Sequence, residues 1–142
     1  MANNDLKKNK KPNVIVGNIG LYYACYELSK RGWNVLPTSR NTKGIDIVIF
    51  DYQNKIHHSI QVKTLTKNDP LPSGDPKNII AAFYFICRNY DKEIPEIFIA
   101  TNKEISNLTI KRTKNNKESY WIHTKDYEQF KNQWEKIGTG NV

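Results

Sequence analysis

Three polar side chains lie within an otherwise apolar stretch near the middle of the sequence. The segment GIDIVIFDYQNKIHHSIQVKT covers residues 44–64 and contains Asp46, Gln61 and Lys63 among isoleucines and valines. Carboxylate and carboxamide oxygens are hard ligands of the kind that Mg²⁺ prefers. A lysine ammonium can orient water or stabilise negative charge that develops on a phosphate. Together these residue types predict phosphodiester hydrolysis assisted by a bound metal ion.

The element expected to position these side chains is a β-hairpin. Residues 45–51 and 56–65 are rich in β-branched side chains, and the polar YQNK between them favours a turn. With Gln53 and Asn54 at the centre of that turn, the register of the two antiparallel strands follows directly.

This register would gather the three polar side chains on one face of the hairpin. Asp46 would lie directly across from Gln61, and Lys63 across from Gly44, because alternate residues of a strand share a face. The isoleucines would form the opposite, apolar face. An ion pair between Asp46 and Lys63 at a strand end, with Gln61 hydrogen-bonded beside it, is the purely structural alternative.

The rest of the chain predicts further strands and flanking helices, and therefore an α/β fold with a mixed sheet. Gly17 and Gly20 are poor helix formers within the first helix, so we expect close backbone packing there. The predicted elements are a helix over about 15–31, strands over 33–38, 81–88 and 95–101, a loop over 66–78, a short helix over 102–108, a strand or extended segment over 119–124, and an amphipathic helix over 125–138 with Tyr127, Phe130, Trp134 and Ile137 on one face.

Composition and charge favour a single globular domain with a polyanionic partner. The chain has 142 residues and a net charge of +8, which fits binding to nucleic acid. Residues 1–12 resemble a flexible basic arm, and residues 13–142 a single domain. No apolar run is long enough for a membrane span, and the amino-terminal segment lacks the apolar core of a secretory signal. Cys25 and Cys87 are expected to be free thiols in a reducing cytoplasm.

The region from Val16 to Thr64 resembles the core of the PD-(D/E)XK nuclease superfamily. Its members have a glycine-marked first helix, then a hairpin with an Asp on one strand and E-x-K or Q-x-K on the next. The matches here are Gly17, Gly20, Asp46 and the run Gln61-Val62-Lys63. The Q-x-K form is similar to that of Mrr-like restriction endonucleases, and the overall resemblance covers roughly residues 14–137.

The resemblance implies a restriction-endonuclease-like fold, with a mixed central sheet of about five strands between an amino-terminal and a carboxy-terminal helix. It implies that Asp46, Gln61 and the main-chain carbonyl of Val62 hold Mg²⁺ or Mn²⁺, and that Lys63 is the catalytic lysine. The substrate would be DNA, including structured or modified forms. Since duplex cleavage needs two cuts and one small domain has one site, a homodimer is expected.

One position departs from the superfamily pattern and keeps other functions open. Many members carry a Glu just after the second glycine of the first helix, where this chain has Leu21, and Glu27 lies two turns further on. Fewer anionic ligands mean weaker cation binding. The alternatives are a catalytically inactive nuclease-fold protein that binds nucleic acid or serves as a regulatory subunit, and a protein-interaction module such as an immunity protein.

Other polar residues near the hairpin allow a functional or a structural interpretation. Arg40, Lys43 and Lys67 are candidate phosphate contacts, or otherwise solvated loop charges. His57 and His58 are predicted to be surface residues at the turn end of the hairpin. His57 is four residues from Gln61, about 13 Å along an extended strand, which is too far to join the polar cluster.

Overall fold

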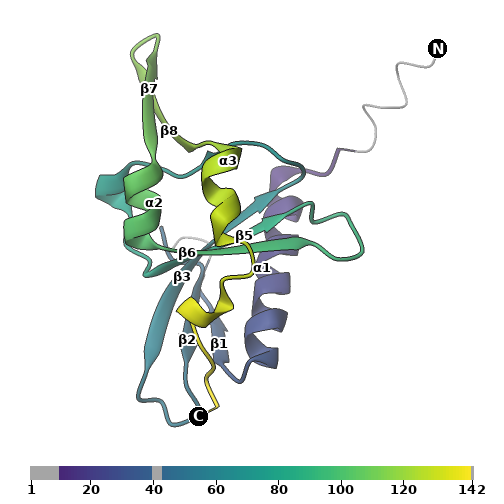
Figure 1. The fold of residues 1–142 in the computed structure, drawn as a ribbon. Coiled ribbons are helices and arrows are strands. Elements are labelled where there is room, and N and C mark those ends of the chain that lie inside the picture. The colour runs from purple at the N-terminus through teal and green to yellow at the C-terminus, as the bar shows by residue number, and fades with distance from the viewer. Residues whose placement is uncertain (1–9, 40–42, 142) are drawn as a thin grey trace, which may run out of the picture.

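The computed structural model describes residues 10–39 and 43–141, and its centre is a five-stranded sheet with helices on both faces (Figure 1). Its strands stand in the order β1-β2-β3-β5-β6; β3 and β5 run parallel, and the other neighbours are antiparallel. The predicted α/β class with a mixed sheet is therefore confirmed. The strands are β1 (Asn34–Pro37), β2 (Ile47–Phe50), β3 (His57–Leu65), β5 (Phe83–Arg88) and β6 (Glu96–Thr101).

The β2–β3 hairpin has the predicted register along most of its length. Ile47 pairs with Ile60 and Ile49 with His58. Asn54 takes a left-handed conformation in the turn, with φ of 56°, as asparagine tolerates better than most residues. The ladder ends at the Ile47–Ile60 pair, one residue short of Asp46, and this early end determines the geometry of the candidate site.

Helix α1 (Asn13–Lys30) covers one face of the sheet, mainly over β3 and β1. Ala24 and Leu28 are fully buried in the same apolar cluster as Ile60. A Cβ atom placed on Gly20 would collide with the side chain of Thr64, whereas one on Gly17 would meet open space. The expectation of close backbone packing is thus confirmed for Gly20 and wrong for Gly17.

The opposite face is covered by α2 (Asn102–Leu108) and by the carboxy-terminal segment (Figure 1). A capping box starts α2: the Thr101 hydroxyl accepts from the Glu104 amide, and the Glu104 carboxylate accepts from the Thr101 amide. This arrangement satisfies two amides that a helix start leaves free. The predicted short helix is therefore confirmed.

The continuous carboxy-terminal helix predicted over 125–138 is wrong, although the segment remains helical in short pieces. These are α3 (Thr124–Tyr127), η2 (Glu128–Phe130) and η3 (Trp134–Lys136). Asn132, between η2 and η3, has a left-handed φ of 55° that stops the helix. The break lets the segment serve both cores, because Tyr127 and Phe130 pack in the cluster beneath α2 while Ile137 packs in the cluster beneath α1.

A small second sheet, in the order β4-β8-β7, was not predicted. It consists of β4 (Leu71–Pro72), β7 (Ile110–Lys114) and β8 (Lys117–Ile122). The expected loop over 66–78 contains β4 and a short helix, η1 (Pro76–Asn78). The β7–β8 hairpin projects away from the central sheet (Figure 1), and both residues of its turn, Asn115 and Asn116, are left-handed, as a tight hairpin requires.

A buried arginine ties the carboxy-terminal segment to the central sheet. Arg88, at the end of β5, is 2% exposed and forms ion pairs with Glu96 on β6 and Glu128 in η2. Its guanidinium also lies 4.6 Å from the ring centroid of Phe98.

Within residues 10–39 and 43–141, no helix combines the length and apolar character that a membrane span requires.

Candidate active site

Asp46 directly precedes the first residue of β2, where the pairing of β2 with β3 ends. The prediction that Asp46 pairs with Gln61 is wrong. The Asp46 amide donates to the carbonyl of Ile60 at 2.9 Å, although Ile60 is already the partner of Ile47. Two consecutive residues therefore face one residue on β3, which is the arrangement of a β-bulge. Such a bulge redirects the side chain of Asp46, and it also removes the predicted opposition of Gly44 and Lys63.

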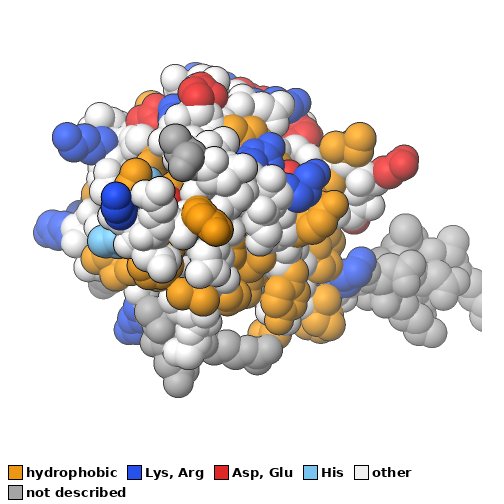
Figure 2. All heavy atoms as spheres, turned by 90° about the horizontal axis from the view of Figure 1, so that it is seen from below, with side chains coloured by type: hydrophobic (Ala, Val, Ile, Leu, Met, Phe, Trp, Pro, Cys, Tyr) orange, Lys and Arg blue, Asp and Glu red, His pale blue; other side chains and the backbone are white. Residues whose placement is uncertain are grey.

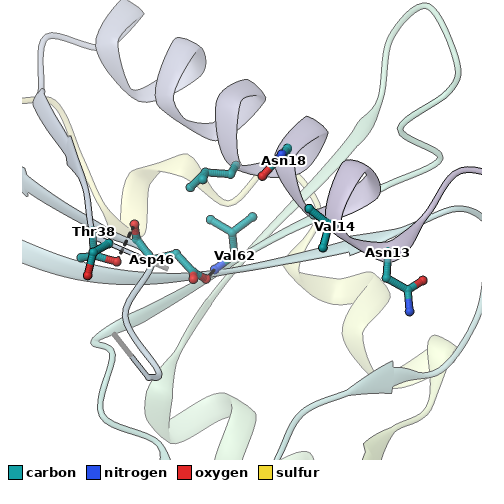
Figure 3. Close-up of a pocket in the computed structure, with 9 residues that line it drawn as sticks. Asn13, Val14, Asn18, Thr38, Asp46 and Val62 are labelled. Carbon is teal, nitrogen blue, oxygen red and sulfur yellow. Dashed lines mark hydrogen bonds between the residues drawn. The ribbon is translucent and has the colours of Figure 1, made fainter. Parts of the chain in front are cut away.

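The redirected carboxylate is held by the backbone of β3. Oδ2 of Asp46 accepts a hydrogen bond from the amide of Val62 at 2.7 Å (Figure 3). In an extended strand the N–H and C=O of one residue point to the same side. The carbonyl of Val62 therefore faces the same space beyond the start of β2 as the Asp46 carboxylate, which agrees with the ligand role that the resemblance implies for it.

Thr38 fixes the backbone of Asp46 from the other side. The Thr38 amide donates to the carbonyl of Asp46 at 2.9 Å, and its hydroxyl donates to the carbonyl of Ile45 at 2.6 Å. Asp46 is thus anchored between β1 and β3, so the position of its carboxylate is determined by two neighbouring strands. Sequence reasoning missed Thr38; its place at the end of the strand predicted over 33–38, which could pair with residues 45–51, was the available signal.

Gln61 and Lys63 share one face of β3, as predicted, but Asp46 lines the cavity beneath α1 together with Val62, so the predicted gathering of all three side chains on one face is wrong. Ile60 and Val62 pack beneath α1, so the alternate residues point to the other face. Both polar side chains are half-buried. Neither the Gln61 amide nor the Lys63 ammonium forms a hydrogen bond or ion pair with any described residue, which leaves both groups available to a ligand.

Burial and the nearby carboxylate act on Lys63 in opposite directions. Burial lowers the pKa of the Lys63 ammonium, and the negative charge of Asp46 partly offsets this by raising the pKa. Burial also raises the pKa of the Tyr84 hydroxyl, and Asp46 raises it further. Tyr84 neighbours Gln61 in the β3–β5 register. Asp46 therefore influences groups on the Lys63 face, although its carboxylate is bonded at the strand edge.

A cavity of about 280 Å³ opens between the start of α1 and the start of β2. Figure 3 shows the Val62 side chain pointing toward the helix across this cavity, with the Asp46 carboxylate beside the Val62 amide. Leu21 also lines it, so the helix position where many superfamily members carry Glu does border Asp46. The polar side chains on the helix side, Asn13 and Asn18, were not predicted to belong to the site. The lining residues are Asn13, Val14, Gly17, Asn18, Leu21, Thr38, Ser39, Asp46 and Val62.

The donor set fits a hard divalent cation that keeps most of its water. Among the described residues, no three His, Cys, Asp or Glu side chains come together that could hold a metal ion. The Asp46 carboxylate, whose Oδ1 accepts no hydrogen bond from a described residue, lines the cavity, and the Val62 carbonyl points to the same side of β3 as the amide that binds it. Mg²⁺ is commonly bound by one or two carboxylates together with water and substrate phosphate. Gln61 forms no described contact with Asp46, so its ligand role stays a prediction.

The three predicted phosphate contacts have different settings. Lys43 is exposed on the turn before Gly44, and Arg40 lies outside the described residues. Lys67 is exposed and lines a second cavity, of about 620 Å³, together with Lys10, Lys11 and Asn13. Asn13 borders both cavities, so the Lys67 cavity adjoins the Asp46 cavity.

Two other residues considered from the sequence have structural roles. His58 is not a surface residue at the hairpin end; its ring packs 5.5 Å from the ring of Trp33 and 5.2 Å from that of Phe83. Burial lowers its pKa. His57 is exposed, as predicted. Glu27 does not line the Asp46 cavity and instead forms an ion pair with Arg31 at 2.7 Å.

Comparison with known proteins adds no assignment. No protein-family model matches the chain, and no curated protein or solved structure matches it. The function must therefore be argued from the geometry and chemistry of the Asp46 site.

Proposed function

We propose that this protein is a metal-dependent endonuclease that hydrolyses phosphodiester bonds in DNA. The observation that carries the proposal is the pairing of two features at one strand end. The Asp46 carboxylate is held by the Val62 amide, and the ammonium of Lys63, the next residue of β3, is half-buried. Neither group forms a salt bridge with a described residue. Because partly buried charges without such a partner lower the free energy of unfolding, the arrangement is better explained by function than by stability.

Each residue has a defined part in the proposed reaction. Asp46 and the Val62 carbonyl would hold Mg²⁺ or Mn²⁺, with Gln61 as a further oxygen ligand. The ammonium of Lys63 orients the attacking water and stabilises the negative charge that develops on the phosphate. A bound cation would supply Lewis-acid activation of the phosphate and of water. Hydrolysis then joins the water oxygen to phosphorus and breaks one phosphorus–oxygen ester bond.

The net charge of +8 supports a polyanionic substrate. The cavity that contains Lys10, Lys11 and Lys67 adjoins the Asp46 cavity through Asn13, and it would accept phosphates next to the scissile one. Arg40 and Lys43, in the segment just before Gly44, are proposed to contribute in the same way.

A homodimer and a cytoplasmic location complete the proposal. A domain with one site makes one cut, so cleavage of both strands requires two copies. Light scattering in the presence of DNA should give the mass of two chains, and the mass of one chain would remove the dimer. Cys25 and Cys87 are both free thiols, which is typical of proteins in a reducing compartment.

The test is cleavage of plasmid and branched DNA in Mg²⁺ and in Mn²⁺. Asp46→Asn and Lys63→Ala should each reduce cleavage at least about a hundredfold, in line with the contribution of a general acid–base or charge-stabilising group. Asp46→Asn keeps an oxygen that can accept from the Val62 amide, so loss of activity cannot be attributed to loss of this bond. Lys55→Ala, an exposed lysine on the β2–β3 turn, is the control and should cleave like the wild type.

One observation favours a second function, a nuclease fold kept for binding. Leu21 lines the Asp46 cavity, so the only described carboxylate at this site is that of Asp46. If neither metal supports cleavage while DNA binding is intact and equal in Asp46→Asn and Lys63→Ala, the inactive alternative replaces the endonuclease. A protein-interaction module of the immunity-protein kind would instead show no salt-dependent binding to DNA.

A further inference from the structure

We propose that the β7–β8 hairpin, residues 110–122, is a nucleic-acid-binding arm that contacts phosphates with one cationic face and takes an unstacked base in a cavity at its root. The inference rests on the proposed function for the identity of the partner, and it goes beyond that function by assigning a binding surface outside the candidate active site.

The two faces of the arm differ in how their charges are paired. Cross-strand partners share a face, so Lys111, Tyr120 and Glu118 lie together on one side. There Lys111 forms an ion pair with Glu118 at 2.9 Å, and the Tyr120 hydroxyl donates to Glu118 at 3.0 Å. The charged groups of Lys111 and Glu118 on this face are therefore paired with each other.

The other face has cations without such partners. Arg112 pairs with Ser119 across the hairpin, and Lys114 pairs with Lys117. Like charges directly opposite one another destabilise a hairpin. None of these three cations forms an ion pair or hydrogen bond with a described residue, and all are exposed. The face formed by Ile110, Arg112, Lys114, Lys117, Ser119 and Trp121, here named the cationic face, therefore presents positive charge that the protein itself does not neutralise.

An exposed aromatic ring stands at the root of the cationic face. Trp121, opposite Ile110, is 37% exposed. A cavity of about 240 Å³ lies beside it and is lined by Pro70, Ile110, Arg112, Trp121 and His123. An indole face next to a guanidinium is a stacking platform that nucleobases of every type can use. Among the three tryptophans, Trp33 is buried and Trp134 is covered by the guanidinium of Arg31 at 3.4 Å.

Residues that line three cavities lead from the candidate active site toward the arm. Asn13 borders the Asp46 cavity and the cavity of Lys10, Lys11 and Lys67. Asp69 lines the latter, and the next residue, Pro70, lines the Trp121 cavity. A polynucleotide that runs from the active site past Lys67 would therefore reach the cationic face of the arm.

On the face seen from below, the described Lys and Arg side chains do not form one continuous patch (Figure 2). They are scattered over this face, with hydrophobic and uncharged side chains between them. A two-stranded ribbon is also narrow enough to enter a DNA groove. The exposed Trp121 ring favours a substrate with unpaired bases, so we expect the arm to prefer single-stranded or branched DNA over a plain duplex.

The experiment measures binding without cleavage, by fluorescence anisotropy of labelled single-stranded and duplex oligonucleotides in EDTA. The variant replaces Arg112, Lys114 and Lys117 by Ala. Loss of three phosphate contacts should weaken binding at least about tenfold and reduce the slope of log affinity against log salt by about 2. The matched control replaces Lys55, Lys92 and Lys103, three exposed lysines on other turns and on α2, and should bind nearly as the wild type does.

Trp121 gives a second readout that does not depend on charge. Its fluorescence should be quenched by the single-stranded oligonucleotide, and Trp121→Ala should weaken single-strand binding about tenfold, whereas Trp121→Phe should retain most of the affinity. Equal weakening by both triple variants would show a diffuse effect of net charge and overturn the arm. Unchanged tryptophan emission together with tighter duplex binding would overturn the stacking site.

The outcomes separate the arm from the endonuclease. Salt-dependent binding that requires the arm, in a protein that cleaves no DNA, would support the arm and count against the proposed activity. If the protein cleaves DNA in a metal-dependent way but its affinity for DNA is unchanged by substitutions in the arm, the endonuclease activity is supported and the proposed binding role of the arm is wrong. Circular dichroism of the triple variants should match the wild type, because all the substituted side chains are exposed.

Discussion

At the scale of single residues, Lys63 shows a conflict between stability and availability for chemistry. Burial lowers its pKa more than Asp46 restores it. The folded protein therefore binds the lysine proton less tightly than the unfolded chain does, and the charged form reduces the free energy of unfolding. This penalty is complete below the folded pKa and fades as the pH rises through it toward the ordinary lysine value.

The Lys63→Met variant should for this reason be more stable than the wild type at neutral pH. The difference should narrow as the pH is raised, because the wild-type lysine then becomes neutral in the folded state. Urea denaturation at neutral and alkaline pH measures the free energy of unfolding directly. Lys55→Met, at an exposed position, serves as control. Lower stability of Lys63→Met at neutral pH would mean that attraction to Asp46 outweighs burial, and would contradict this account.

The sequence identifies the residues of the hairpin site better than their geometry. The register of Ile47 against Ile60 was predictable, since a slip of one residue would expose the isoleucines. The bulge at Asp46 was not predictable, because the Thr38 amide that bonds the Asp46 carbonyl reaches it only through the pairing of β1 with β2. Local patterns do not specify which third strand pairs with a hairpin.

At the scale of elements, substitutions at two glycines of α1 can distinguish the effect of helix propensity on stability from the effect of packing. Gly20 lies against β3, where a Cβ would approach the Cβ of Thr64 to 2.9 Å, and Gly17 has nothing within 4 Å. Gly20→Ala should lower the free energy of unfolding by about 1–3 kcal/mol through overpacking. Gly17→Ala should raise it by about 0.5–1 kcal/mol, because alanine is the better helix former.

Thermal or urea denaturation of the two glycine variants provides the measurement, and each variant is the control for the other. Helix propensity alone predicts the same sign for both substitutions, so opposite signs would identify contact with Thr64 as the cause. If both substitutions were stabilising, the close contact between α1 and β3 at Gly20 would be disproved.

Elements that depend on distant partners were the hardest to predict. The residues of β7, Ile110–Lys114, are all exposed and lack the alternation of a half-buried strand. Their only local signal is the pair Asn115–Asn116, a sequence typical of a tight turn. The apolar spacing of Tyr127, Phe130 and Ile137 fits a helix, yet these side chains enter two different cores. Tertiary packing therefore overrode a valid local pattern.

At the scale of the whole molecule, the ion pairs of Arg88 link the central sheet to the carboxy-terminal segment. The Arg88 hydrogen bond lowers the pKa of Glu96 to about 2, and bonds from Asn89 and Lys131 contribute in the same direction. A carboxylate whose pKa is depressed stabilises the fold above its unfolded pKa and loses that contribution as the pH falls toward the folded value. The affected window extends from about pH 4.5 down to about pH 2.

The Glu96→Gln variant should be less stable than the wild type at neutral pH and should lose less stability on acidification. Removing one partner of a buried guanidinium leaves its charge incompletely paired. Urea denaturation across the acid range gives both free energies of unfolding. Glu93→Gln is the matched control, because Glu93 is exposed on the β5–β6 turn and forms no ion pair with a described residue. Parallel pH profiles for Glu96→Gln and the wild type would refute the role of this network.

The long crossover between the parallel strands β3 and β5 contains a strand, β4, whose partner is made much later, and this separation sets an order for folding during synthesis. The β2–β3 hairpin closes over a short turn, so α1 can pack on it as soon as those residues leave the ribosome. The crossover through residues 66–82 contains β4, whose Leu71 pairs with Ile122 near the far end of the chain. Such long-range pairings form late. The newly made chain is thus expected to assemble the Asp46 and Lys63 end of the hairpin well before the arm that would deliver a polynucleotide to it.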